Sequence, residues 1–201
     1  MLKVALTGGI ATGKSYVLDQ CRRRGVPCLD ADELAHGVTG AGTEATAAIA
    51  ARFGAAILAA DGSVDRKALG LIVFADGAAR RELEAIVHPA VYRAITAGLR
   101  GFELMGDGAF AVVDVPLLYE TGAEQGFDRV IVTACAPEIQ LARLIERGVT
   151  EAAARQRLAA QWPQEKKASR ANFVINTDGA CADTDTQVDH VLRQILKSSE
   201  P

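Results

Sequence analysis

The chain has 201 residues, with 25 Asp and Glu against 22 Lys and Arg, and its formal net charge at pH 7 is −3. This length suits one domain with room for inserted subdomains. The near-neutral charge excludes a protein that coats nucleic acid, so any basic site must be local. No apolar run approaches the ~20 residues of a membrane span, and we expect neither a signal peptide nor a membrane partner.

The cysteines show no disulfide or metal pattern. No Cys-x-x-Cys occurs, and no cysteine forms a metal-ligand pair with a histidine. We therefore expect free thiols and a cytoplasmic protein. The cysteines are Cys21, Cys28, Cys135 and Cys181.

Five short runs predict strands. They are apolar throughout instead of alternating with polar residues, which indicates strands buried on both faces of a parallel sheet. The runs are Leu2–Thr7, Val26–Leu29, Phe110–Val115, Arg129–Thr133 and Phe173–Asn176.

Longer segments with helical patterns separate these strands. Strands that alternate with helices indicate an α/β fold with helices on both faces of the sheet. The last five residues, 197–201, are expected to form a frayed tail. The predicted helices are Lys14–Arg24, Asp32–Val38, Thr43–Phe53, Arg66–Val73, Ala78–Val87, Pro89–Glu103, Pro137–Glu146, Glu151–Gln161 and Thr186–Leu196.

Two spacings between strands exceed what one helix requires. About eighty residues separate the second and third strands, so we expect a helical insertion within one domain, over residues 36–105. Residues 137–170 carry seven basic and four acidic side chains, a surplus of three positive charges in an acidic protein. We interpret 137–170 as a mobile cover over an anionic ligand; a solvated helical face with ion pairs is the alternative.

A phosphate-binding loop follows the first strand. The segment Gly8-Gly9-Ile10-Ala11-Thr12-Gly13-Lys14-Ser15 fits G-x-x-x-x-G-K-[ST] between a strand and a helix. Glycines let successive N–H groups converge on phosphate oxygens, and the helix N-terminus is electropositive. In this motif Lys14 reaches the β- and γ-phosphates and the Ser15 hydroxyl coordinates Mg²⁺. No base-reading N-K-x-D motif of GTPases occurs, and the size favours phosphoryl transfer to a small molecule.

Carboxylates follow the second and third strands, at the edge where doubly wound sheets bind ligands. Asp30 and Asp32 are two residues apart, so on an extended segment they face the same way. Each can cap the next helix, but near a γ-phosphate Asp32 can accept the proton of an attacking hydroxyl. Asp114 can hold the shell of the Mg²⁺ ion, or it can form an ion pair or a helix cap. Whether Asp114 or Asp30 serves the metal stays open.

Several strings together resemble the dephospho-coenzyme A kinases, and the match covers essentially the whole chain. The glycine pair followed by Ile and the Pro-Leu-Leu-aromatic-Glu string are more specific than the loop alone. The strings are Leu6 to Ile10 with Gly13-Lys14-Ser15, Asp30-Ala31-Asp32, His88-Pro89, Val115-Pro116-Leu117-Leu118-Tyr119-Glu120, and Arg170 to Asn176.

The resemblance implies a P-loop kinase-like parallel sheet flanked by helices, with a helical substrate-binding insertion and a helical lid. It also implies ATP-dependent phosphorylation of the ribose 3′-hydroxyl of dephospho-coenzyme A, with Mg²⁺. Asp32, Lys14 and Arg143 would be catalytic, with Arg147 as a second lid candidate, and Asp32, His88 and Arg66 would bind the acceptor. The expected nucleotide-binding residues are Gly9, Ala11, Thr12, Gly13, Lys14, Ser15 and Tyr16, and the expected metal ligands are Ser15 and Asp114.

Some residues depart from the family or allow another interpretation. Ala11 stands where the family usually has Gly, so the loop geometry must suit an L-residue. Tyr16 replaces the usual Thr and can turn to the far side of its helix. His36 can be an exposed histidine, His88 can fix a helix entry, and Trp162 is expected to be a packing anchor more than a base-stacking platform.

Two rival functions remain at this stage. One is another nucleoside or small-metabolite kinase of the same fold. The other is a nucleotide-binding regulatory module without transfer chemistry. An acceptor base and an arginine-bearing lid argue against the regulatory module, because a switch needs neither.

Overall fold

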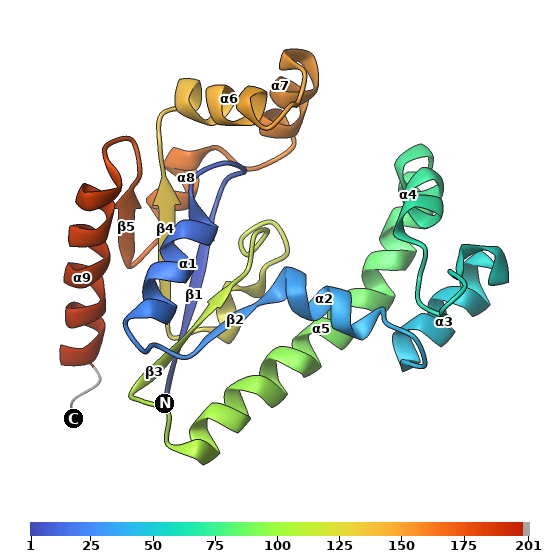
Figure 1. Ribbon diagram of the computed structural model, residues 1–201, viewed down its shortest axis with the longest axis horizontal. Coiled ribbons are helices and arrows are strands. Elements are labelled where there is room, and N and C mark those ends of the chain that lie inside the picture. The colour runs from blue at the N-terminus through green and yellow to red at the C-terminus, as the bar shows by residue number, and fades with distance from the viewer. Residues whose placement is uncertain (199–201) are drawn as a thin grey trace. The chain divides into compact units, whose positions relative to one another are not determined.

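A five-stranded sheet organises the computed structural model, which describes residues 1–198. The strand order is β2-β3-β1-β4-β5 and every pairing is parallel (Figure 1). All five predicted strands are confirmed, with ends that shift by one or two residues. The strands are β1 Leu2–Gly8, β2 Cys28–Asp30, β3 Phe110–Asp114, β4 Arg129–Ala134 and β5 Phe173–Asn176.

Both faces of the sheet are buried. Val4 of β1 packs in one hydrophobic cluster with Val17 of α1 (Lys14–Arg23) and Val188 of α9 (Cys181–Lys197). Ala5, which alternates to the other face, is also fully buried. The continuous apolar strands therefore have the burial expected of a parallel sheet, and the α/β prediction is confirmed. Helix α9 reaches Lys197, which was expected in the frayed tail, and residues 199–201 of that tail lie outside the described residues.

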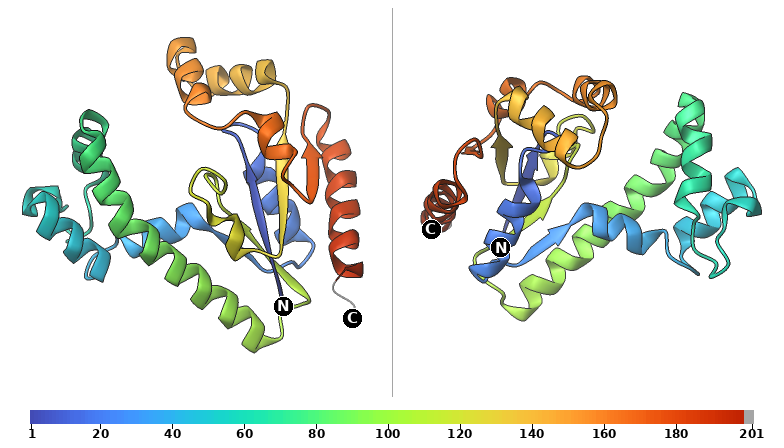
Figure 2. Two further views of the ribbon diagram at one scale, coloured as in Figure 1. Left: turned by 180° about the vertical axis from the view of Figure 1, so that it is seen from behind. Right: turned by 45° about the horizontal axis from the view of Figure 1, so that its top comes forward.

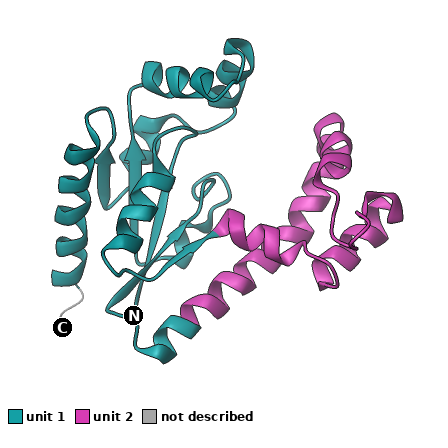
Figure 3. Ribbon diagram, viewed as in Figure 1, with its two compact units in different colours: residues 1–30, 101–201 teal, residues 31–100 magenta. Residues whose placement is uncertain are grey.

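Two compact units make up the chain (Figure 3). Unit 1 comprises residues 1–30 and 101–201, and unit 2 comprises residues 31–100. Unit 2 is helical, as expected, and has its own apolar core around Ile49, Val64 and Leu69. Its elements are α2 Ala31–Val38, α3 Glu44–Phe53, the 3₁₀ turn Ala55–Ile57, α4 Arg66–Ala75 and α5 Gly77–Met105, of which the last residues belong to unit 1.

One long helix replaces two predicted ones. Helix α5 continues through His88 and Pro89, so the expected break at Pro89 is wrong. Pro89 removes one backbone hydrogen bond from a 29-residue helix. The turns on either side are held by packing, since Val87 joins the core of unit 2 and Ala90 is buried. His88 therefore does not fix a helix entry.

Three helices in unit 1 occupy residues 137–170, the segment that the sequence predicts to cover the ligand. They are α6 Pro137–Glu146, α7 Glu151–Ala159 and α8 Gln164–Ala168; we refer to residues 137–170 as the lid. The views in Figures 1 and 2 place α6 and α7 beyond the carboxyl end of β4. Helix α8 was not predicted, because five residues are too few to show a helical period. A 3₁₀ turn also spans Ala123–Gly126.

All four cysteines are free thiols, as expected. Burial raises the pKa of Cys21 to about 11 and the pKa of Cys28 to about 12. Within residues 1–198, no helix is long and apolar enough to cross a membrane.

Candidate active site

The phosphate-binding loop joins β1 to α1. Gly13 has φ 81°, in the left-handed region that favours glycine, and precedes α1 with no side-chain cap. The first-turn N–H groups of Lys14, Ser15 and Tyr16 have no intrahelical acceptor, by the geometry of a helix. Within residues 1–198 no side chain or carbonyl bonds the Lys14 ammonium. The loop thus offers several N–H groups and one cation to an anion.

Close contacts with neighbouring residues explain why glycine occupies positions 8 and 9. A Cβ atom at Gly8 would lie 2.3 Å from the Thr133 Oγ1 atom and 2.6 Å from the Thr133 carbonyl oxygen. At Gly9 it would lie 2.3 Å from the Gln164 Nε2 atom. No larger residue fits at Gly8 without moving β4.

Ala11 takes a conformation that usually belongs to glycine. Its φ of 61° is the only positive value of a non-glycine residue within 1–198. An L-residue can adopt this left-handed conformation at a cost of roughly 1–2 kcal/mol. The methyl group is buried against Leu144 of α6 and Ala154 of α7. Packing against the lid therefore offsets part of the strain in the loop.

Thr12 stabilises the loop from inside. Its hydroxyl donates to the Gly9 carbonyl at 2.8 Å and lies 2.7 Å from the Thr133 hydroxyl. Its N–H points back to the same Gly9 carbonyl at 3.3 Å. The Thr177 hydroxyl donates to the Thr12 carbonyl at 2.9 Å. The structure thus places the side chain of Thr12 in a buried network of hydroxyl groups.

Tyr16 points away from the loop. Its hydroxyl donates to the Asp185 carboxylate of α9 at 2.9 Å. That hydrogen bond, helped by burial, raises the pKa of Tyr16 to about 12. Only the main chain of Tyr16 is therefore available to a ligand at the start of α1.

Two carboxylates meet at the carboxyl edge of the sheet. Asp30, the last residue of β2, is the register partner of Asp114, the last residue of β3. Within residues 1–198 no cluster of three or more His, Cys, Asp or Glu side chains forms a metal cage. A hydroxyl and one or two carboxylates suit Mg²⁺, which usually keeps several waters and binds substrate phosphates. Ser15, Asp114 and Asp30 therefore fit the predicted metal.

Unit 2 contains the three predicted acceptor residues. Asp32 is exposed and is the second residue of α2. The alternation argument that paired it with Asp30 does not apply, because the chain is helical from Ala31. Burial lowers the pKa of the Arg66 guanidinium, and the charge of Asp32 nearby opposes that shift. The Arg66 Nη1 atom also lies 3.0 Å from the Nε2 atom of His36, which is exposed, as one interpretation of the sequence expected.

His88 and Arg66 differ in how firmly they are held. The Arg66 Nη2 group donates to the Ala35 carbonyl at 3.0 Å and to the Thr39 hydroxyl at 2.9 Å. His88 is half-buried in the middle of α5 and, within residues 1–198, its ring has no hydrogen bond.

Arg143 of α6 binds the main chain beside the loop. Its guanidinium donates to the Thr177 carbonyl at 2.6 Å and to the Ala11 carbonyl at 3.2 Å. It is therefore half-buried and ordered by the protein, unlike the exposed Arg147. This contact fixes the lid arginine to the same loop that the sequence assigns to ATP.

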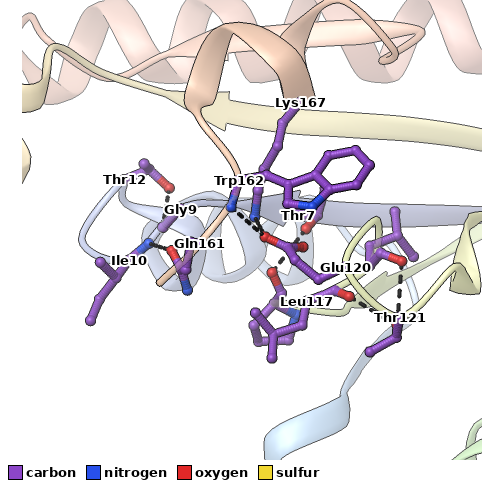
Figure 4. A network of polar contacts seen from close by, with 12 residues as sticks. Thr7, Gly9, Ile10, Thr12, Leu117, Glu120, Thr121, Gln161, Trp162 and Lys167 are labelled. Atoms are coloured by element: carbon purple, nitrogen blue, oxygen red, sulfur yellow. Dashed lines mark hydrogen bonds and ion pairs between the residues drawn. The ribbon is translucent and has the colours of Figure 1, made fainter. Parts of the chain in front are cut away.

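The base of the lid rests on a buried ion pair (Figure 4). Lys167 of α8 is fully buried, and its Nζ atom lies 2.7 Å from the Glu120 Oε1 atom. The same oxygen accepts a hydrogen bond of 3.0 Å from the main-chain N–H of Trp162. The Trp162 ring stacks on Tyr119, with centroids 6.1 Å apart. The expectation that Trp162 is a packing anchor agrees with these contacts.

Changing Glu120 to Gln is expected to destabilise unit 1 by about 3 kcal/mol, because it leaves the buried Lys167 ammonium without a counter-charge. Burial alone would raise the pKa of Glu120, but hydrogen bonds from Lys167 and the Trp162 N–H hold it below its ordinary value of 4.5. The stability that the ionised group contributes is present above that value and is lost as the pH falls through the lower, folded pKa. Denaturant unfolding across pH should therefore show the difference in stability between Glu120→Gln and the unchanged protein becoming smaller as the pH falls below 4.5.

Glu124→Gln is the matched control, since its partner Arg170 is about half exposed. That change should cost less than about 1 kcal/mol. If Glu120→Gln and Glu124→Gln lose equal stability at neutral pH, the buried pair of Glu120 and Lys167 contributes no more to stability than the exposed pair does.

Sequence reasoning missed two glutamines that reach the loop. Gln140 of α6 donates to the Ile10 carbonyl, and Gln161 accepts from the Ile10 N–H, both at 2.7 Å. They border a pocket of about 190 Å³ that also touches Gly9 and Trp162. No motif marks them, because each contact spans more than 120 residues. The one available signal was that four glutamines, Gln140, Gln156, Gln161 and Gln164, occur in the stretch 137–170 that was expected to cover the loop.

Comparisons with known proteins agree with this geometry. The family model described as dephospho-CoA kinase matches residues 2–183. A dephospho-CoA kinase of Geobacillus kaustophilus is 44% identical over 194 residues, which cover 96% of each chain. One from Anaeromyxobacter dehalogenans is 49% identical over 181 residues, covering 90% of this chain and 85% of the relative.

A solved structure extends the likeness to three dimensions. The dephospho-CoA kinase from Campylobacter jejuni is 28% identical, covers 98% of both chains and superposes with a TM-score of 0.75. The P-loop kinase fold predicted from the sequence is thereby confirmed. With the family model and the curated relatives spanning nearly the whole chain, this protein belongs to the dephospho-CoA kinase family.

Proposed function

We propose that the chain transfers the γ-phosphoryl group of ATP to the ribose 3′-hydroxyl of dephospho-coenzyme A, giving coenzyme A and ADP. The observation that carries the proposal is the phosphate loop with the unbonded Lys14 ammonium, in a chain related along its length to dephospho-CoA kinases. The N–H groups of Ala11 and of Gly13 to Tyr16 would hold phosphate oxygens, and the main chain at Gly9 would lie beside them. Lys14 would offset the charge on the transferring group.

Ser15 would bind Mg²⁺ directly, and Asp114 or Asp30 would hold its water shell at the edge of the sheet. When bound, the ion would offset negative charge on the phosphates during transfer. The register pairing of Asp30 with Asp114 supports this placement.

Residues 36–105 would form the acceptor-binding insertion, and Asp32 lies four residues before this insertion begins. Asp32 would accept the proton of the 3′-hydroxyl as the oxygen attacks the γ-phosphorus. The ordered Arg66 guanidinium beside Asp32 suits an anionic acceptor, and His88 would bind the acceptor from α5. Residues 137–170 would form the lid that excludes water from the reacting groups.

The substrates are small molecules, and nothing in the charge of the chain calls for nucleic acid. Four free thiols suit a reducing compartment, so we place the reaction in the cytoplasm. Other small-metabolite kinases share the fold, and the acceptor is therefore the feature to test.

A coupled assay of ADP release tests the proposal. ADP should appear rapidly with ATP, Mg²⁺ and dephospho-coenzyme A. Coenzyme A is the matched control, because its 3′-oxygen is already phosphorylated and cannot attack. Release that is equal with dephospho-coenzyme A and with coenzyme A would contradict transfer to the 3′-hydroxyl. Faster release with adenosine would favour a nucleoside kinase.

Arg143→Ala is expected to lower turnover by about 10²-fold, since a charge-assisted donor beside the phosphates is lost. It should also cost about 1–3 kcal/mol of stability, because the Thr177 and Ala11 carbonyls lose their shared donor. Kinetics and denaturant unfolding measure both effects. Arg157→Ala, on the exposed surface of α7, is the control and should change neither. Unchanged turnover in Arg143→Ala would leave the residue with a structural role alone.

A further inference from the structure

Two lid glutamines bond both main-chain polar groups of one loop residue, Ile10. The Gln140 side-chain amide donates to the Ile10 carbonyl at 2.7 Å. The Ile10 N–H donates to the side-chain oxygen of Gln161, also at 2.7 Å (Figure 4). Gln140 is only 4% exposed, so its amide needs such a partner.

Further lid contacts constrain the next residue of the loop. Ala11 has the strained φ of 61°, and Leu144 and Ala154 bury its methyl group. Arg143 donates to its carbonyl at 3.2 Å. The lid therefore contacts residues 10 and 11 through hydrogen bonds and through apolar packing.

Gln161 is itself held in place. The next residue, Trp162, donates its N–H to Glu120 and stacks on Tyr119. Glu120 is paired with the fully buried Lys167. The side chain of Gln161 thus starts from a backbone anchored to unit 1, and its contact with Ile10 is well defined.

The loop needs such support. Two adjacent glycines, Gly8 and Gly9, precede Ile10 and allow the backbone many conformations. Phosphate binding requires several N–H groups to converge on one point, which a flexible loop must first arrange at an entropic cost. The contacts at Ile10 remove that cost before a nucleotide arrives.

We infer that Gln140 and Gln161 are positioning residues for ATP: together they hold the main chain of Ile10 on both sides and pre-form the phosphate-binding loop. The inference rests on the proposed function, although neither glutamine touches the reacting atoms. The N–H of Ile10 is occupied by Gln161, so the phosphates are bound by the N–H groups that follow it.

Methionine variants test this inference, since Met is close to Gln in length and lacks the amide. Gln140→Met and Gln161→Met should each weaken ATP binding about tenfold, as measured by calorimetry. The double variant should lose little more ATP affinity than either single variant, because both glutamines hold the main chain of the same residue, Ile10. Gln156→Met, on the exposed face of α7, is the matched control and should bind ATP as the unchanged protein does.

Amide hydrogen exchange at Ile10 separates positioning from general structural damage. Exchange should become faster in Gln161→Met, which frees that N–H, and much less so in Gln140→Met, which frees only the carbonyl. Gln161→Glu keeps an oxygen acceptor and should keep the Ile10 amide protected. If a methionine variant has a lowered melting temperature, the difference in Ile10 exchange between the two variants still separates positioning from general destabilisation.

Three results would overturn the inference: an unchanged ATP affinity in the double variant, an equal loss in Gln156→Met, or tighter ATP binding in Gln161→Met. The last result would mean that Gln161 competes with phosphate for the Ile10 N–H. Failure of the proposed function is distinguishable, because it would appear as absent transfer to dephospho-coenzyme A in the unchanged protein.

Discussion

Lys14→Ala should lower the rate of phosphoryl transfer by about 10³-fold or more while leaving the fold intact. The large effect is expected because the ammonium is the cation that the loop itself presents to the β- and γ-phosphates. The small effect on stability is expected because no group within residues 1–198 bonds that ammonium. Coupled ADP release and thermal unfolding measure the two quantities.

Lys197→Ala is the matched control for the loss of one positive charge, since Lys197 lies exposed at the end of α9. Its turnover should equal that of the unchanged protein. Turnover of Lys14→Ala near the control value would mean that the loop does not bind the transferring phosphate. A large drop in melting temperature would instead show that Lys14 supports the fold.

The sequence predicted the sheet well because burial on both faces leaves a simple pattern. Residues 110–114 and 129–134 are apolar almost without interruption, and a parallel sheet is the usual cause of such runs. Pro89 led to a wrong helix boundary. The rule that proline ends a helix considers only neighbouring residues, whereas the packing of Val87 and Ala90 involves residues far away in the chain.

The phosphate loop was visible in the sequence because its chemistry is contiguous. Lys14 and Ser15 follow Gly13 directly, so one motif contains the whole ligand cradle. The contacts that hold the loop were not visible, because they join residues far apart in the chain. Gln161 to Ile10 and Arg143 to Ala11 are examples, and a glutamine carries no motif that announces such a partner.

Asp32→Asn should lower turnover by about 10²–10⁴-fold, the range typical of a lost general base. Asn keeps the size of the side chain and its ability to accept a hydrogen bond, but it cannot take up the proton of the 3′-hydroxyl. Stability should fall by less than about 1 kcal/mol, because an exposed carboxylate in the first turn of α2 interacts only weakly with the helix dipole. Steady-state kinetics should show a fall in kcat with little change in KM for ATP.

Glu33→Gln separates proton transfer from simple loss of charge. Glu33 is the next residue of the same helical turn and is also exposed, so the change alters the local field to a similar extent. If Asp32 is the general base, Asp32→Asn should have a low turnover, whereas Glu33→Gln should keep the turnover of the unchanged protein. If both variants lose turnover equally, the negative charge at the start of α2 matters and proton transfer does not. If Asp32→Asn retains full turnover but its melting temperature falls by several degrees, the carboxylate stabilises the start of α2 and does not take part in proton transfer.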